Sequence, residues 1–147
     1  MKDIPLGTRA ELHYTVTRDK TVPFIYEEFE EFRQMPEVFA TGLMVSMLEA
    51  CCQKAIIPFL DWPREGSLGT HVDFSHLAAT PAGMTIHVRA EVIAVDGRRI
   101  TFRAEAHDGI DKISEGTHER TVVDYERFNA RVAQKAARAA ADRKPGP

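Results

Sequence analysis

The sequence predicts an α+β fold in which an antiparallel sheet covers one long helix. The stretch from residue 35 to residue 60 is apolar enough for a buried helix, and it follows a first strand-like segment. Four further segments with strand-like alternation come after it and are separated by short turns. A run of strands with a single buried helix is typical of a domain whose sheet packs against that helix.

The central helix is expected to begin at Thr41 and to end before Pro58, because proline cannot continue the backbone hydrogen bonding. Glu49 is the only charged residue between residues 38 and 53, and apolar side chains surround most of the helix. Such a helix is buried in a core or spans a membrane. Its polar residues make the apolar run too short and too interrupted for a span. We therefore expect no membrane segment, and we expect the buried carboxylate of Glu49 to be paired or functional.

The strands follow from alternation with a period of two and from the turns between them. Asp96-Gly97 is a hairpin signal, and two more turns are expected at residues 80–83 and 108–109. The expected strands span residues 10–16, 67–76, 85–95, 98–107 and 111–125. A helix over residues 126–141 is predicted to follow, and residues 142–147 are expected to form a flexible tail.

The alternation also predicts which side chains face the helix. The inward residues are expected to be Ile86, Val88, Ala90, Val92 and Ala94 in one strand, and Ile100, Phe102, Ala104 and Ala106 in the next. Gly69 interrupts a strand, which suggests that another group approaches the backbone closely there. Arg120 has the same parity as Val122, so it is expected to point inward and to need an acidic or ligand partner.

Five strands around a single helix form the hotdog arrangement, and residues 1–147 are expected to be one domain. A lone hotdog domain leaves a sheet edge and part of its helix uncovered. We therefore expect a homodimer, or a tetramer of two such dimers.

Composition and charge exclude several classes of protein. The net charge is −3 and no basic stripe is present, so nucleic acid is not an expected partner. No apolar signal core begins the chain, and Cys51 and Cys52 are adjacent, where a disulfide would be strained. These features favour a cytoplasmic protein with reduced cysteines. No Cys/His spacing fits a metal site.

Several motifs carry a resemblance to a known family. They are PEVFATG at residues 36–42 with Glu49, EGSLGT at residues 65–70, His76 followed by AATP, AHDG at residues 106–109 and GTHER at residues 116–120. In these motifs, and in one register from about residue 20 to residue 135, the chain is similar to the fluoroacetyl-CoA thioesterase family of hotdog enzymes. The resemblance implies hydrolysis of a small acyl-CoA thioester, with coenzyme A as part of the substrate and no separate cofactor.

The resemblance also implies roles for individual residues. Thr41, Glu49 and His76 match the family's catalytic set. The positions expected to contact substrate are Gly69, Arg120, Phe32, Met35 and Phe39.

Two departures from the family's pattern concern the acyl pocket. Met35 stands where the fluoroacetate-selective enzyme has a lid phenylalanine, while Phe32 keeps the other lid aromatic. Ala50 stands where that enzyme has a tryptophan after its catalytic glutamate. A flexible thioether and a missing ring change the shape of the pocket, so we expect a different acyl selectivity.

The residues leave the details of the chemistry open. Thr41 attacks the thioester, positions a water, or only caps the helix. Glu49, whose pKa burial would raise, acts as a base or attacks the thioester directly. A histidine such as His76 is by itself more often structural than catalytic.

Two other functions are compatible with the fold. One is a hotdog dehydratase or hydratase, although no Gly-Asp-x-Asn-Pro-x-His run is present. The other is a non-catalytic acyl-CoA binding protein.

Overall fold

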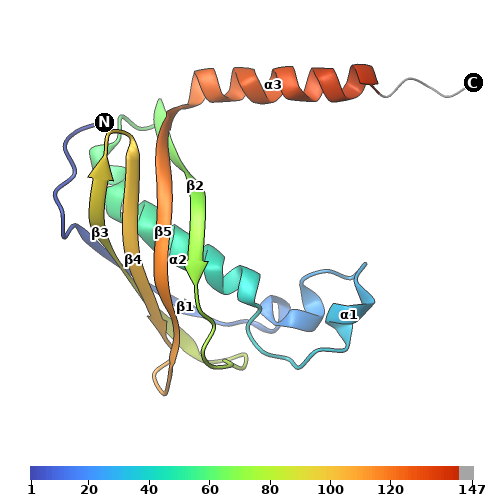
Figure 1. The fold of residues 1–147 in the computed structure, drawn as a ribbon. Helices are drawn as coiled ribbons and strands as arrows, with labels where there is room; N and C mark the ends of the chain where they lie inside the picture. The colour runs from blue at the N-terminus through green and yellow to red at the C-terminus, as the bar shows by residue number, and fades with distance from the viewer. Residues whose placement is uncertain (143–147) are drawn as a thin grey trace, which may run out of the picture.

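The computed structural model describes residues 1–142 and confirms the hotdog fold. In chain order the elements are β1 (Arg9–Thr15), α1 (Glu30–Arg33), α2 (Thr41–Ile56), β2 (Glu65–Phe74), β3 (Thr85–Asp96), β4 (Arg99–His107), β5 (Lys112–Asp124) and α3 (Tyr125–Asp142), with short 3-10 turns at Arg18–Lys20, Val22–Phe24 and Ile57–Phe59. The sheet curls around α2 (Figure 1). The predicted tail lies outside the described residues from residue 143 on, and Asp142 is the last residue of α3.

The five strands form one antiparallel sheet in the order β1-β3-β4-β5-β2. The edges are therefore β1 and β2, the strands on either side of α2 in the sequence. The first strand, β1, and the strand that follows α2, β2, thus lie at opposite edges of the sheet. The helix crosses the concave face between them (Figure 1).

The inward faces are largely as the alternation predicts. All four expected residues of β4 are buried, from Ile100 to Ala106. In β3 the prediction fails only at Ala94, which is exposed. The pairing of β3 with β4 shifts between Val92 and Ala94, and this irregularity turns Val95 toward the core instead.

Strand β2 begins and ends two residues earlier than predicted. It starts at Glu65, in what was expected to be a loop, and ends at Phe74. His76 consequently lies in the segment after the strand and not within it. This difference matters for the site, because a residue outside the pleated ladder is not restricted to one face of the sheet.

Helix α2 does not begin with the expected threonine cap. Ala40 occupies the N-cap position, and Thr41 is the first helical residue with no cap hydrogen bond from a side chain. The side facing the sheet is fully buried, whereas Gly42, Ser46 and Ala50 on the other side are exposed. One side of the central helix is thus uncovered in a single chain.

By length and composition alone, the stretch Thr41–Phe59 would suffice to cross a membrane, contrary to the expectation that its apolar run is too short. The core helix of a protein without membrane segments passes the same test. Here the stretch contains α2, whose buried side packs against the sheet.

Cys51 and Cys52 are free and completely buried in the core. Burial raises the pKa of the Cys51 thiol to about 11 and that of the Cys52 thiol to about 12. Both side chains are therefore protonated and act as small apolar core residues.

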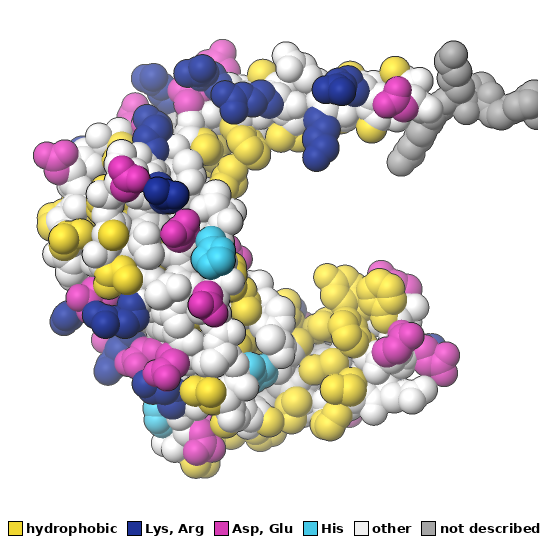
Figure 2. Space-filling view, viewed as in Figure 1, with side chains coloured by type: hydrophobic (Ala, Val, Ile, Leu, Met, Phe, Trp, Pro, Cys, Tyr) yellow, Lys and Arg dark blue, Asp and Glu magenta, His cyan; other side chains and the backbone are white. Residues whose placement is uncertain are grey.

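Two segments extend from the body on the side of the β2 edge. The first contains α1 and carries the exposed aromatic side chains of Phe24, Tyr26 and Phe29. The second is α3, which has no buried residue. In the space-filling view the two segments face each other across an open hollow, and apolar side chains line both sides of it (Figure 2).

Candidate active site

The hydroxyl of Thr41 lies 2.8 Å from Nδ1 of His76. Thr41 is placed by the first turn of α2, and His76 by the segment after β2, 35 residues further on. Since the helix cap does not use the hydroxyl, it is free to donate to the imidazole. The structure thus brings together two of the three residues implied by the resemblance.

The second ring nitrogen of His76 has an unusual environment. Among the residues that the structure describes, His76 Nε2 is buried and has no hydrogen-bond partner. A buried polar nitrogen without a partner is costly. If Nδ1 accepts the proton of the Thr41 hydroxyl, Nε2 carries the ring hydrogen and requires an acceptor.

Glu49 lies two turns further along α2 and belongs to a second cluster. Its Oε1 is 3.5 Å from Nη1 of Arg120 and 3.4 Å from Nε2 of His118. The expected complete burial is wrong, because 35% of the side chain is exposed. Gly69 explains how the carboxylate reaches β2, since a Cβ at that position would collide with Glu49 Oε1. The close approach predicted from Gly69 is thus present.

Arg120 is buried and points inward as its parity predicts. Its guanidinium donates to the hydroxyl and the carbonyl of Ser67, both at 2.8 Å, and to Oε1 of Gln53 at 3.3 Å. Burial lowers its pKa, and the nearby Glu49 opposes this effect. An arginine remains charged in proteins, so Arg120 presents a fixed positive charge to Glu49.

His118 is a member of this cluster that the sequence analysis missed. Its Nδ1 lies 2.7 Å from the carbonyl of His71, which can only accept, so Nδ1 carries the hydrogen. Nε2 is then free to accept from Arg120 Nη1 at 3.1 Å. Burial is the largest cause of a lowered pKa, and Arg120 lowers it further. The neutral ring is therefore favoured. Its parity with Arg120 and Val122 could have identified it as an inward residue.

The two clusters are separate within one chain. Thr41 and Glu49 are eight positions apart in α2, which corresponds to about 12 Å along the helix. The ion pairs and hydrogen bonds of the described residues connect His76 only to Thr41, and Glu49 only to His118 and Arg120. The expected catalytic set is thus divided between two places.

The remaining positions implied by the resemblance make no side-chain hydrogen bond or ion pair with either cluster among the described residues. Phe32 is half-buried against Tyr26 and Phe29 in the α1 segment. Met35 is 51% exposed, and Phe39 is 1% exposed and packs near Tyr14 in the core. A cavity of about 480 Å³ opens beside the start of α2. It is lined by Asp19, Lys20, Phe24, Ile25, Tyr26, Gly42, Leu43 and Ser46.

Comparisons with known proteins identify the family and the fold. The family described as fluoroacetyl-CoA-specific thioesterase matches residues 16–126. The fluoroacetyl-CoA thioesterase of Streptantibioticus cattleyicolor is 50% identical over 136 residues, which are 92% of this chain and 97% of the relative. A solved fluoroacetyl-CoA thioesterase is 48% identical with a TM-score of 0.88, covering 91% of this chain and 98% of the other. A thioesterase superfamily member from Thermus thermophilus is 32% identical with a TM-score of 0.86, covering 96% of this chain and 99% of the other.

The hotdog fold and these similarities define the protein as a thioester hydrolase that acts on acyl-CoA. The chain belongs to the fluoroacetyl-CoA-specific thioesterase family. The family and the class of reaction predicted from the sequence are confirmed, and the hydratase and binding-protein alternatives gain no support.

Proposed function

We propose that the enzyme hydrolyses small acyl-CoA thioesters with Thr41, Glu49 and His76, without a separate cofactor. The observation that carries this proposal is the 2.8 Å contact between the Thr41 hydroxyl and His76 Nδ1. His76 accepts the hydroxyl proton while the threonine oxygen attacks the thioester carbonyl. The C–S bond then breaks, and the protonated imidazole donates its proton to the CoA thiolate. Water, deprotonated by His76, releases the acid from the acyl-threonine.

The carboxylate that completes this set is proposed to come from a second copy of the chain. The uncovered side of α2 and the open β2 edge support a homodimer, as does the unpartnered His76 Nε2 among the described residues. In a two-fold pair each contact occurs twice. If two α2 helices cross antiparallel near Val45, which lies midway between Thr41 and Glu49, Glu49 of each copy approaches Thr41 and His76 of the other.

Mixing two inactive variants tests this arrangement. A His76→Ala subunit paired with a Glu49→Gln subunit contains one site with both native residues if the site is shared. Random pairing should then restore about a quarter of the parent rate, because half of the dimers are mixed and each has one intact site. Each variant mixed with itself is the control. Failure to restore activity in proven mixed dimers would place the complete set within one chain.

The acyl selectivity is proposed to differ from that named for the relatives. Met35 is exposed in the α1 segment and Ala50 is exposed beside Glu49, whereas the family pattern has aromatic rings at both positions. A more adaptable pocket gains about 0.8 kcal/mol for each methylene that it buries, or roughly fourfold in binding. The enzyme should therefore prefer short-to-medium or aromatic acyl groups to acetyl, and should discriminate poorly between fluoroacetyl and acetyl.

The test is kcat/KM for acetyl-, fluoroacetyl-, butyryl- and phenylacetyl-CoA, in the parent and in Met35→Phe. The phenylalanine should narrow the range of acyl groups. A strong parental preference for fluoroacetyl-CoA would refute the selectivity proposal and leave the hydrolase activity intact.

A cytoplasmic location is also proposed. Its support is the pair of free cysteines, which fits a reducing compartment. Fractionation of the native cell, with the thioesterase activity as the marker, tests it.

A further inference from the structure

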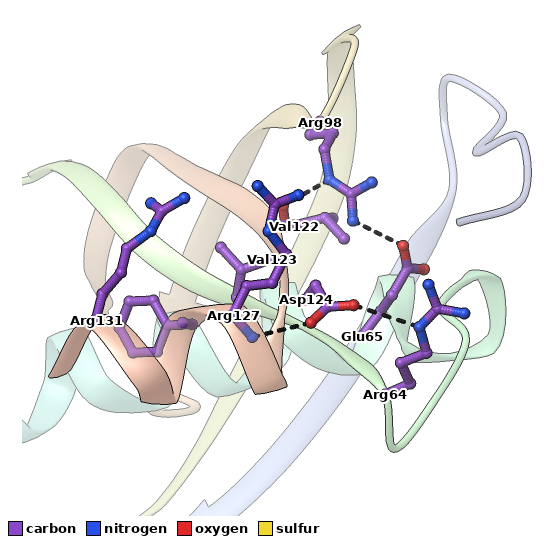
Figure 3. A pocket seen from close by; sticks show the side chains of 9 residues that line it. Arg64, Glu65, Arg98, Val122, Val123, Asp124, Arg127 and Arg131 are labelled. Carbon is purple, nitrogen blue, oxygen red and sulfur yellow. Dashed lines mark hydrogen bonds and ion pairs between the residues drawn. The ribbon is translucent and has the colours of Figure 1, made fainter. Parts of the chain in front are cut away.

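A pocket lined by four arginines lies at the end of the sheet where β5 continues into α3 (Figure 3). Its volume is about 390 Å³. The lining residues come from the loop before β2, the first residue of β2, the β3–β4 turn, the end of β5 and the first turns of α3. They are Arg64, Glu65, Arg98, Val122, Val123, Asp124, Arg127, Phe128 and Arg131.

The pocket carries an excess of positive charge that its own carboxylates do not neutralise. Arg98 pairs with Glu65 at 2.7 Å, and Arg64 pairs with Asp124 at 3.3 Å. Arg127 and Arg131 make no ion pair with any residue that the structure describes. Four arginines against two carboxylates leave a net charge of +2 on the lining, although the whole chain carries −3. The amino group of Met1 also lies 2.6 Å from Glu65 and adds to the excess.

The two unpaired arginines project from one face of α3. They are four residues apart, a spacing that puts side chains one above the other on a helix. The backbone amide of Arg127 donates to Asp124, which fixes the start of the helix beside the pocket. Their guanidinium groups are thus carried by a regular element and not by a loop.

The pocket and the cluster around Glu49 share the strands β2 and β5. Val122 and Asp124 follow Arg120 along β5 by two and four residues, so this side of the pocket lies within about 14 Å of Arg120. On the neighbouring strand, Glu65 precedes Ser67, which binds Arg120 through its hydroxyl and carbonyl. A ligand with its reactive end near Glu49 can therefore extend an anionic end toward the arginines.

We propose that this arginine pocket binds the phosphate groups of the CoA thioester whose acyl end lies near Glu49 of the same chain. The proposal rests on the proposed function, since it assumes that Glu49 marks the reacting end. Guanidinium groups present paired N–H donors that match phosphate oxygens, and they bind phosphate more specifically than lysine does. In an acyl-CoA the phosphates are the anionic groups, and a flexible arm separates them from the thioester.

The test compares substrates that have the same acyl group and differ only in the phosphate-bearing part of the molecule. The variant is Arg127→Gln/Arg131→Gln, which keeps the Arg98 and Arg64 ion pairs. The matched control is Lys135→Gln/Arg138→Gln, which removes the same charge further along α3. Each is assayed with an acyl-CoA, the corresponding acyl-dephospho-CoA and the corresponding acyl-pantetheine.

For the arginine variant, KM for the acyl-CoA should rise about tenfold, as expected for lost hydrogen bonds to charged groups at a partly exposed site. Its kcat, and both constants for acyl-pantetheine, should stay as in the parent. Added salt should raise KM for acyl-CoA less in the variant than in the parent. Inorganic pyrophosphate should compete with acyl-CoA in the parent and much less in the variant.

The proposal is overturned if KM rises equally for acyl-CoA and acyl-pantetheine, if the control variant behaves like the arginine variant, or if no constant changes. These outcomes differ from a failure of the proposed function. In that case Glu49→Gln would leave acyl-pantetheine hydrolysis unchanged in the parent background, whatever the arginines do.

Discussion

Glu49 reaches β2 only because residue 69 has no side chain. A methyl group at this position would collide with Oε1 of Glu49 and would lie 3.0 Å from Cε1 of His118. The atom that would have to move is the end of a flexible side chain, so the backbone does not need to shift. The absence of one Cβ thus leaves room for the carboxylate beside Arg120.

Gly69→Ala should therefore reduce activity without unfolding the protein. We expect kcat to fall on the order of a hundredfold, comparable to the loss of a general acid–base group, while the melting temperature changes by a few degrees at most. Thr70→Ala, at the exposed neighbouring position, is the control and should keep its rate. A Gly69→Ala enzyme with the parental kcat would show that the position of Glu49 is unimportant.

His76 and Glu49 should behave as one unit in kinetics. Residues that act together are strongly non-additive, so the double variant His76→Ala/Glu49→Gln should have a residual rate similar to that of His76→Ala. Each single change should cost on the order of a hundredfold or more in kcat. Release of free CoA thiol measures this, and a Glu49→Gln rate within a few-fold of the parent would make Glu49 structural.

At the scale of single residues, the sequence predicted the place of some side chains in the candidate site and not of others. Gly69 and Arg120 could be understood from strand parity and from the absence of a side chain. His76 could not, because its partner Thr41 is 35 residues away and no local pattern connects them; only the resemblance singled it out. His118 was missed although its parity was the same as that of Arg120.

His118 is a buried residue of β5 that contacts both the neighbouring strand β2 and Glu49 of α2. Its neutral form donates to the carbonyl of His71 on β2 and accepts from Arg120 on β5. The contact joins the two strands near the middle of their pairing, where the register shifts between Gly69 and His71. Protonation of the ring would remove His118 as an acceptor for Arg120 Nη1 and would place two positive charges together.

The lowered pKa of His118 predicts a dependence of stability on pH. Below the unfolded value of about 6.5 the unfolded chain binds a proton that the native ring does not. The free energy of unfolding should thus fall as the pH drops below about 6.5, by at most about 1.4 kcal/mol per pH unit. Denaturant unfolding between pH 7 and pH 5 should show a smaller fall for His118→Asn. The exposed His107→Gln should keep the parental slope.

The sequence predicted every long element, and its errors lie at the ends. Strand β2 was placed two residues late because Asp61 to Gly66 has the composition of a loop, yet Glu65 pairs with Asp124. Ala94 was assigned inward because strict alternation cannot anticipate an irregular pairing. Thr41 was expected to cap α2, since nothing in the local sequence shows that a distant histidine binds its hydroxyl.

At the scale of the whole molecule, the hotdog topology could be predicted because one buried helix and five strands leave few arrangements. The separation of Thr41 and His76 from Glu49 could not, since it depends on which residues of α2 meet which strand. The order of the sheet leaves β2 at an edge and one side of α2 uncovered. Both features are reasons to expect an assembly of more than one chain.

We expect the protein to be at least a dimer at micromolar concentration. Light scattering measures this directly, and the mass should correspond to two chains or four. A charged residue on the uncovered side of α2, as in Ser46→Glu, should shift the mass toward one chain and abolish thiol release together. A fully active monomer would contradict both the assembly and the shared site.

The complete burial of Cys51 and Cys52 has a practical consequence for measuring this enzyme. Their thiols are inaccessible, and their pKa values of about 11 and about 12 leave almost no thiolate at neutral pH. A thiol-reactive dye should therefore report only the CoA that is released, with no label on the native protein and two labels after denaturation. For the same reason the product cannot form a mixed disulfide with the enzyme that made it.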